Sequence, residues 1–176
     1  MTILAIDGST KSTGWSIFCN GKLIDYGCIT ASSTDKIKRI QKMGTEIANI
    51  INQNPSIEHI VMEEVIPKSG DYDTPKNKNT QRALMWLQAA TAFIIHEINP
   101  KIEFTYVYPS EWRKKCKIKQ GAGIQRETLK DRDIAFVEKN YNLTVNDDIA
   151  DAICIGHSFF IEEEPEKKST KLYWGQ

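Results

Sequence analysis

The chain has 176 residues, a length that fits one domain with a single hydrophobic core. Its composition, 40% hydrophobic and 26% charged, is typical of a soluble globular protein, and 23 basic residues balance 23 acidic ones, which argues against a protein that is basic throughout. No apolar run approaches the ~18 residues of a membrane span, and the apolar start is interrupted too early for a signal peptide. These features predict a cytoplasmic protein.

The four cysteines, Cys19, Cys28, Cys116 and Cys154, show no CxxC spacing and no nearby histidine pairs. Neither a zinc site nor a disulfide framework is therefore indicated. We expect reduced thiols, as is usual in the cytoplasm.

The first apolar run, residues 3–6, reads as a strand that is covered on both faces, because it lacks the alternation of a half-exposed strand. It ends at Asp7, and a turn between Gly8 and Gly14 leads into a return strand over 15–18. A buried, ionised carboxylate costs several kcal/mol unless a metal ion or backbone N–H groups compensate it. The alternative is an ordinary hairpin in which Asp7 caps its own turn.

Further along the chain, hydrophobic periodicity predicts alternating strands and helices. The turn Asn20-Gly21 leads into a third antiparallel strand over 22–29, and a short buried strand over 59–62 ends at Glu63 and Glu64. The remaining predicted segments are a helix over 34–52, a mobile polar loop over 67–79, a helix over 80–99, a strand over 103–108, a helix start near 109, a flexible break over 120–123, a helix over 124–141, a last helix from 146 to about 159, and a poorly ordered charged tail over 162–176.

The predicted helix over 80–99 has two apolar stripes. One is continuous and suits the core, whereas the second consists of Trp86, Ala89 and Phe93 on another face. A helix with two apolar faces buries both. The second stripe is covered either by another subunit or by the C-terminal helix.

Basic residues are concentrated between residues 111 and 132, where eight of them stand against three acidic residues. A local basic patch on a neutral protein is what binding to a polyanion requires. A solvated loop with a lysine-rich helix start is the alternative.

Two further acids, Asp148 and Asp151, are one helical turn apart on one face of the last helix. One of them could serve only to complement the helix dipole, but apolar neighbours surround Asp151. Together with Asp7 and Glu63 they predict a four-acid cluster that needs bound cations. Oxygen ligands without His or Cys favour Mg²⁺ or Mn²⁺, and two ions about 4 Å apart would promote phosphodiester hydrolysis. With the basic stretch, this indicates a nuclease.

The order of these motifs resembles the RuvC family of Holliday junction resolvases over residues 3 to about 160, and most specifically in the Asp148-Ile149-Ala150-Asp151-Ala152 run. The first loop alone also resembles the phosphate loops of actin-like ATPases, which are about twice this length. The resemblance implies an α/β ribonuclease-H-like fold, with a mixed five-stranded sheet of three antiparallel strands followed by parallel strands, flanked by helices. Residues 1–161 would form the nuclease domain and residues 162–176 the charged tail.

By this resemblance, the catalytic and metal-binding residues are Asp7, Glu63, Asp148 and Asp151, with Glu64 as the rival of Glu63. Two Mg²⁺ ions, which Mn²⁺ can replace, are the implied cofactors. The junction-probing loop falls on 66–79 and the helix of two-fold contact on 80–99, which implies a homodimer. The DNA-binding candidates are Lys117, Lys119, Arg126 and Lys130.

The implied activity is cleavage of four-way DNA junctions in recombination and repair, leaving 5′-phosphate and 3′-hydroxyl ends. The Asp7-Gly8-Ser9 start and the long Lys/Asn loop depart from the bacterial pattern and look more like the phage branch, which often accepts other branched DNA. The protein would act in a bacterium or a phage-infected cell. Three alternatives stay open: a nuclease acting on RNA or RNA–DNA hybrids, a non-catalytic branched-DNA-binding protein, and structural acids with a basic stretch that binds a protein.

Overall fold

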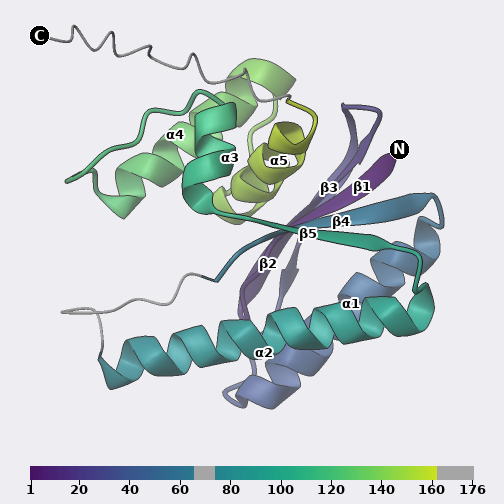
Figure 1. The fold of residues 1–176 in the computed structure, drawn as a ribbon. Coiled ribbons are helices and arrows are strands. Elements are labelled where there is room, and N and C mark those ends of the chain that lie inside the picture. The colour runs from purple at the N-terminus through teal and green to yellow at the C-terminus, as the bar shows by residue number, and fades with distance from the viewer. Residues whose placement is uncertain (66–73, 162–176) are drawn as a thin grey trace, which may run out of the picture.

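The computed structural model describes residues 1–65 and 74–161 of the chain, which form one five-stranded sheet flanked by helices (Figure 1). The predicted alternation of strands and helices is confirmed. The elements in chain order are β1 (Thr2–Asp7), β2 (Ser12–Cys19), β3 (Lys22–Thr30), α1 (Lys36–Gln53), β4 (Ile57–Glu63), α2 (Pro75–Ile98), β5 (Glu103–Val107), α3 (Pro109–Lys115), α4 (Arg126–Tyr141) and α5 (Asp147–Phe159).

The strand order across the sheet is β3-β2-β1-β4-β5. β1 and β2 are antiparallel, as are β2 and β3, and the tight turn between β2 and β3 is possible because Asn20 and Gly21 both take positive φ angles, 49° and 80°. β4 lies parallel to β1 and to β5. The predicted mixed sheet, with three antiparallel strands followed by parallel ones, is therefore confirmed.

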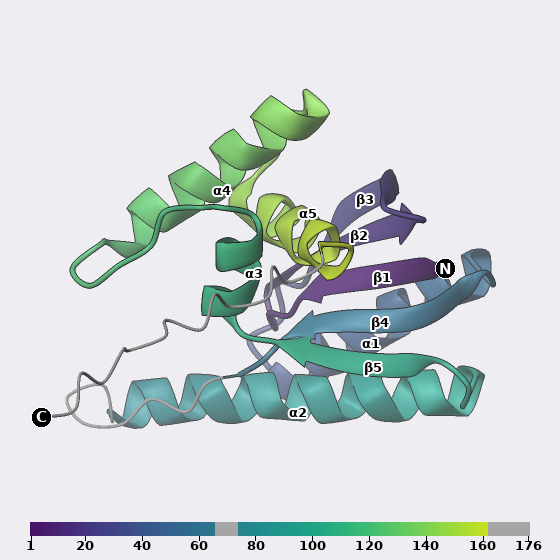
Figure 2. The same cartoon turned by 45° about the horizontal axis from the view of Figure 1, so that its top comes forward.

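Helices cover both faces of the sheet (Figure 2). Leu4 and Ile6 of β1 point into a core formed with α1 and α2, whereas Ile3 and Ala5 point into a second core formed with α3, α4 and α5. Successive residues of a strand face opposite sides, so a strand with helices on both sides is apolar throughout. This confirms the interpretation of the first apolar run.

α2 begins earlier than the sequence predicted. Thr74 caps it by accepting a hydrogen bond from the Asn77 backbone N–H at 3.2 Å, and Pro75 occupies the first turn, where a missing N–H has no cost. Residues 75–79 are thus helical and not part of a loop. Residues 66–73 of the predicted mobile loop, and the predicted tail over 162–176, lie outside the described residues.

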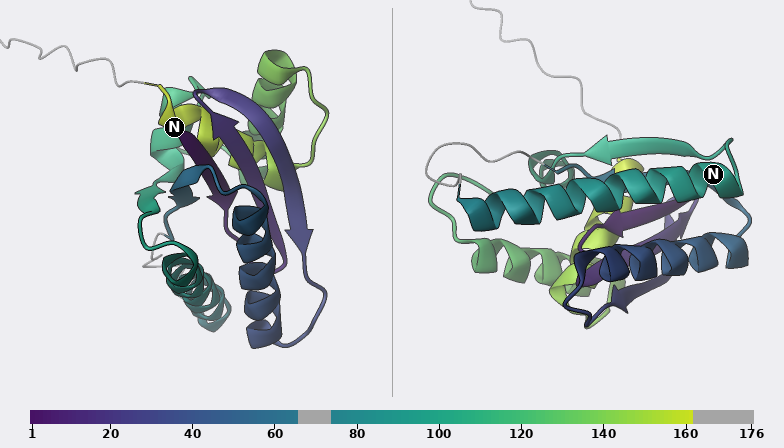
Figure 3. Two further views of the ribbon diagram at one scale, coloured as in Figure 1. Left: turned by 90° about the vertical axis from the view of Figure 1, so that its right-hand side faces the viewer. Right: turned by 90° about the horizontal axis from the view of Figure 1, so that it is seen from below.

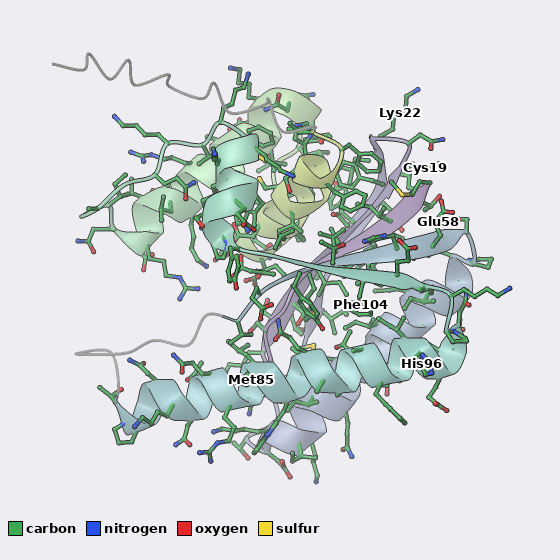
Figure 4. All side chains as sticks on the ribbon, viewed as in Figure 1. Cys19, Lys22, Glu58, Met85, His96 and Phe104 are labelled. Carbon is green, nitrogen blue, oxygen red and sulfur yellow. The ribbon has the colours of Figure 1, made fainter. Side chains whose placement is uncertain are left out.

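The second apolar stripe of α2 remains exposed within the described chain. Trp86 is 46% and Phe93 66% exposed, and the neighbouring Met85, labelled in Figure 4, is 55% exposed. α5 packs on the opposite face of the sheet, as the two views of Figure 3 show. The alternative in which the C-terminal helix covers this stripe is therefore wrong.

Two further sequence expectations concern cysteines and membrane spans. All four cysteines are free thiols, and Cys116 at the end of α3 and Cys154 of α5 are buried in the same core. Over residues 1–65 and 74–161, no helix has both the length and the apolar character to cross a membrane.

Candidate metal centre and nucleic-acid interface

The acids at the ends of β1 and β4 are neighbours because these two strands run parallel, so their carboxyl ends meet at one edge of the sheet. Asp7 is the last residue of β1, and Glu63 is the last residue of β4. Asp7 is paired across the sheet with Gly14 of β2. Because Gly14 has no side chain, this pairing leaves room beside Asp7 for another element to pack on the sheet.

Gly14 allows the first turn of α5 to pack directly on the sheet. A Cβ at this position would overlap the backbone carbonyl of Asp148, so any other residue would push α5 away. Asn146 caps the helix through a 2.9 Å hydrogen bond from the Ile149 N–H to its side-chain oxygen. Asp148 and Asp151, one turn apart, thereby reach the strand ends.

The electrostatics of the four predicted acids show that they lie near one another. Burial, together with the charges of Glu63 and Asp148, raises the pKa of Asp7 to about 8. Burial, together with the charges of Asp7 and Asp133, raises the pKa of Asp151 to about 9, and burial also raises the pKa of Glu63. Such shifts are expected for carboxylates that are crowded in a site with too few positive charges.

Each acid except Asp7 and Asp151 has a specific donor. The Ser12 hydroxyl donates to Asp148, and the Trp112 indole N–H donates to Glu63 at 3.0 Å. Asp151 is only 8% exposed, and its Oδ1 has no hydrogen-bond partner among the residues that the structure describes. A buried carboxylate oxygen without a donor is costly unless a cation binds there.

The chemistry of these residues fits a hard divalent cation, although the acids do not form a ready-made ligand set. Within the described ranges, no three His, Cys, Asp or Glu side chains converge closely enough to hold a metal. Like charges disfavour convergence of the carboxylates, and Asp148 and Glu63 accept hydrogen bonds from Ser12 and Trp112. Oxygen donors of this kind suit Mg²⁺ or Mn²⁺, and a bound ion would draw them together.

Glu63 and Glu64 occupy different environments, although both line the same cavity. Glu63 acts on Asp7 through its charge, whereas the Glu64 side chain accepts a hydrogen bond from the Val65 N–H at 3.1 Å. The Glu64 backbone N–H also continues the pairing with β5 by donating to the Val107 carbonyl at 2.9 Å. The choice of Glu63 as the ligand stays a prediction, and its charge contact with Asp7 supports it.

Three of the four predicted acids line a cavity of about 490 Å³ that also has basic residues in its lining, whereas Asp148 is not among the lining residues. The three acids are Asp7, Glu63 and Asp151. Arg126 and Lys130, two of the predicted DNA-binding residues, line the cavity from α4, and both lower the pKa of Asp7 by their charges. The cavity therefore combines oxygen ligands for a cation with cationic groups that suit a phosphate.

The other two DNA-binding candidates lie outside this cavity. Lys117 and Lys119 are exposed on the connection between α3 and α4, and Lys117 has a positive φ of 57°. The carbonyl of Lys119 accepts a 2.6 Å hydrogen bond from Arg132, which ties the connection to α4. Lys130 differs from both, because it also forms an ion pair with Asp147.

Sequence reasoning missed three residues that shape the site. Arg113 lines the cavity and pairs with Asp133, which is completely buried, and Trp112 contacts Glu63. Asp133 had a signal, since it lies four residues from both Leu129 and Val137 on the inner face of α4. The contact of Trp112 with Glu63 had none, because nothing in the sequence shows that α3 packs against the end of β4.

Comparison with known proteins finds no matching protein-family model and no matching curated protein. Solved structures do match. Thermus thermophilus RuvC in complex with a Holliday junction substrate superposes with a TM-score of 0.67 at 13% identity, over 90% of this chain and 91% of that one. The yeast mitochondrial Holliday junction resolvase superposes with a TM-score of 0.56 at 14% identity, over 90% and 77%. This chain therefore has the ribonuclease-H-like fold of the RuvC-type resolvases.

Proposed function

We propose that this protein is a structure-specific DNA endonuclease that resolves four-way junctions, and other branched DNA, by metal-dependent hydrolysis leaving 5′-phosphate ends. The observation that carries the proposal is the cavity that the half-buried carboxylates of β1 and β4 and the buried Asp151 of α5 line together with cationic side chains of α4. The same fold occurs in a Thermus thermophilus RuvC bound to a Holliday junction substrate, which supports junction DNA as the substrate class.

Asp7, Glu63, Asp148 and Asp151 would hold Mg²⁺, with Mn²⁺ as a substitute. When bound, two such ions supply charge stabilisation at the scissile phosphate and lower the pKa of water. The unpartnered Oδ1 of Asp151 and the raised pKa of Asp7 support this ligand set, because a bound cation would compensate a carboxylate oxygen without a donor and a carboxylate crowded by other acids.

The other residues of the site position the ligands and attract the substrate. Trp112 and Ser12 fix Glu63 and Asp148 by donating hydrogen bonds to them, and Gly14 fixes the distance between β2 and α5. Arg126 and Lys130 offer positive charge beside the acids, where a phosphodiester would lie. The reaction requires no covalent bond between substrate and protein.

Arg126, Lys130, Lys117 and Lys119 would contact the DNA backbone. Binding should then weaken as salt is added, because phosphate contacts release counterions. Arg126→Ala should reduce the slope of log affinity against log salt by about 1. The measurement uses protein that also carries Asp7→Asn, in EDTA, so that cleavage does not interfere; an unchanged slope would remove Arg126 from the interface.

The exposed stripe of α2 supports a homodimer, in which a second copy covers Trp86 and Phe93. Two-fold symmetry would place two sites on opposite strands of a junction. Light scattering should give a dimer for the native protein and a monomer for Trp86→Glu. Ile37→Glu on α1 is the matched control, since Ile37 is 50% exposed on a different helix. A monomeric native protein would contradict the dimer.

The substrate is tested by incubating the protein and Mg²⁺ with a four-way DNA junction, a three-way fork, a linear duplex and an RNA–DNA hybrid. Paired, symmetric cuts in the junction are expected. Cuts in the fork are also expected, and they would show that the protein cleaves branched DNA other than four-way junctions. Cleavage of the hybrid alone would overturn the proposal in favour of a ribonuclease.

A further inference from the structure

The Arg113 side chain is fixed beside the candidate site by contacts with Asp133 and Trp112. Its guanidinium donates to both carboxylate oxygens of Asp133, with Nε–Oδ1 at 3.2 Å and Nη2–Oδ2 at 2.8 Å. The guanidinium also stacks over the ring of Trp112 at 4.1 Å from the centroid, and only 12% of the side chain is exposed. A bidentate pair that is also stacked on an aromatic ring fixes the guanidinium in one orientation.

This orientation places Arg113 near Asp151 without bonding it. Nη2 lies 4.0 Å from Oδ1 of Asp151, beyond hydrogen-bond distance, and Oδ1 has no partner among the described residues. The positive charge is close enough to stabilise the carboxylate, yet both lone pairs of Oδ1 stay free. Asp133 is the residue that keeps the guanidinium from moving closer.

Two buried carboxylates thus share one arginine in different ways. Asp133, completely buried on α4, is saturated by Arg113, and Asp151 on α5 is left open towards the cavity. An arginine that lost Asp133 would have Asp151 as its nearest acceptor, and a movement of about 1 Å would bring it into hydrogen-bond distance.

We propose that Arg113 and Asp133 form a positioning pair, in which Asp133 holds the guanidinium away from Asp151 so that Asp151 stays free to bind a divalent cation. The pair acts through Asp151 and touches neither substrate nor ion. This inference deepens the proposed function and rests on its metal site.

The test is a Mn²⁺ titration, with free Mn²⁺ counted by electron paramagnetic resonance and no DNA present. Asp133→Asn should weaken Mn²⁺ binding at least about tenfold, since Arg113 then pairs with Asp151. The double variant Asp133→Asn with Arg113→Gln should bind Mn²⁺ more tightly than Asp133→Asn alone, because the competing cation is gone. Asp131→Asn, an exposed change on the same helix, is the matched control and should bind as the native protein does.

Rescue by the second substitution separates positioning from support of the fold, because a purely structural pair would make the double variant no better than the single one. That result, or native affinity in folded Asp133→Asn, would overturn the inference. Thermal unfolding establishes that each variant is folded. If Asp133→Asn is not, Arg113→Lys decides the question, since one ammonium cannot replace the bidentate fork: affinity should fall about tenfold, and native affinity would overturn the inference.

The titration also separates this inference from the proposed function. Native protein that binds no Mn²⁺ at millimolar concentration would refute the metal site itself and the positioning pair with it. Native protein that binds Mn²⁺ alongside unaffected variants would refute only the pair. Mn²⁺ binding that follows the predicted order in a protein that cleaves no DNA would support the pair while refuting the nuclease.

Discussion

The two faces of the sheet are built from the same strands but differ in what they bury. On the face of α1 and α2, β1 contributes Leu4 and Ile6 to a core of apolar side chains. On the face of α3, α4 and α5, buried Asp133 and Asp151 lie beside the apolar core. Apolar burial stabilises the fold, whereas buried carboxylates reduce stability unless they are paired. The carboxylates of the second face therefore reduce the stability of the fold, and the apolar core of the first face offsets this loss.

The largest expected difference between the two faces is between Asp7→Asn and Ile47→Ala, compared by Mn²⁺ affinity and by the free energy of unfolding. Asp7→Asn should lower Mn²⁺ affinity more than about 100-fold, because a ligand is lost. It should also raise the stability of the metal-free protein near neutral pH, since the amide removes a crowded carboxylate. Ile47→Ala should lower the free energy of unfolding by about 2–5 kcal/mol while the folded protein binds Mn²⁺ normally.

Urea unfolding in EDTA and Mn²⁺ titration measure both quantities for this pair of variants. A metal-free Asp7→Asn protein that is less stable than the native one would indicate that the acids are structural. It would also remove the contrast between the faces.

Two glycines at the contact between α5 and the sheet, Gly14 of β2 and Gly156 of α5, allow a finer comparison. Gly14→Ala and Gly156→Ala should each destabilise by about 1–3 kcal/mol, since a Cβ meets the Asp148 carbonyl in one case and the Phe18 ring in the other. Only Gly14→Ala should also weaken Mn²⁺ binding, because it displaces Asp148. Equal Mn²⁺ affinity in the two variants would show that the close approach of α5 does not position the site.

Trp112→Phe keeps most of the packing of α3 but removes the donor to Glu63. We expect the free energy of unfolding to fall by at most about 3 kcal/mol, the upper value for a hydrogen bond to a charged group. Mn²⁺ binding should become about tenfold weaker. The same titration and unfolding curves provide the measurement. Unchanged metal affinity would favour Glu64 as the ligand in place of Glu63.

The metal-free protein should also show a pH dependence of stability. Asp7 has a pKa of about 8 in the folded protein against an ordinary value of 3.8, so between these values the folded state keeps a proton that the unfolded state has lost. The free energy of unfolding should therefore fall as pH rises through this window. Asp151, with a pKa of about 9, acts in the same direction.

Thermal unfolding from about pH 5 to about pH 9 in EDTA measures this slope. Mg²⁺ should reverse it at the alkaline end, because the ion binds the ionised carboxylates. Asp7→Asn should flatten the slope. Stability that rises with pH in EDTA would contradict the raised pKa values.

Most of the fold and part of the candidate site could be predicted from the sequence. Local patterns sufficed for β1, the Asn20-Gly21 turn and the two-stripe helix, since periodicity and turn chemistry act over a few residues. The pairing of Arg113 with Asp133 joins α3 to α4 across 20 residues, and it depends on tertiary packing that periodicity does not encode. The start of α2 was misplaced because Thr74 and Pro75, which are also turn residues, form a helix cap here.

The most direct test of the central claim is cleavage of a synthetic four-way DNA junction in Mg²⁺, comparing the native protein with Asp7→Asn at equal junction binding. The acids of the second face predict paired cuts with 5′-phosphate ends for the native protein and none for the variant, although both bind the DNA. Cleavage retained by Asp7→Asn would contradict the assignment of the site, and an intact junction with the native protein would contradict the proposed function.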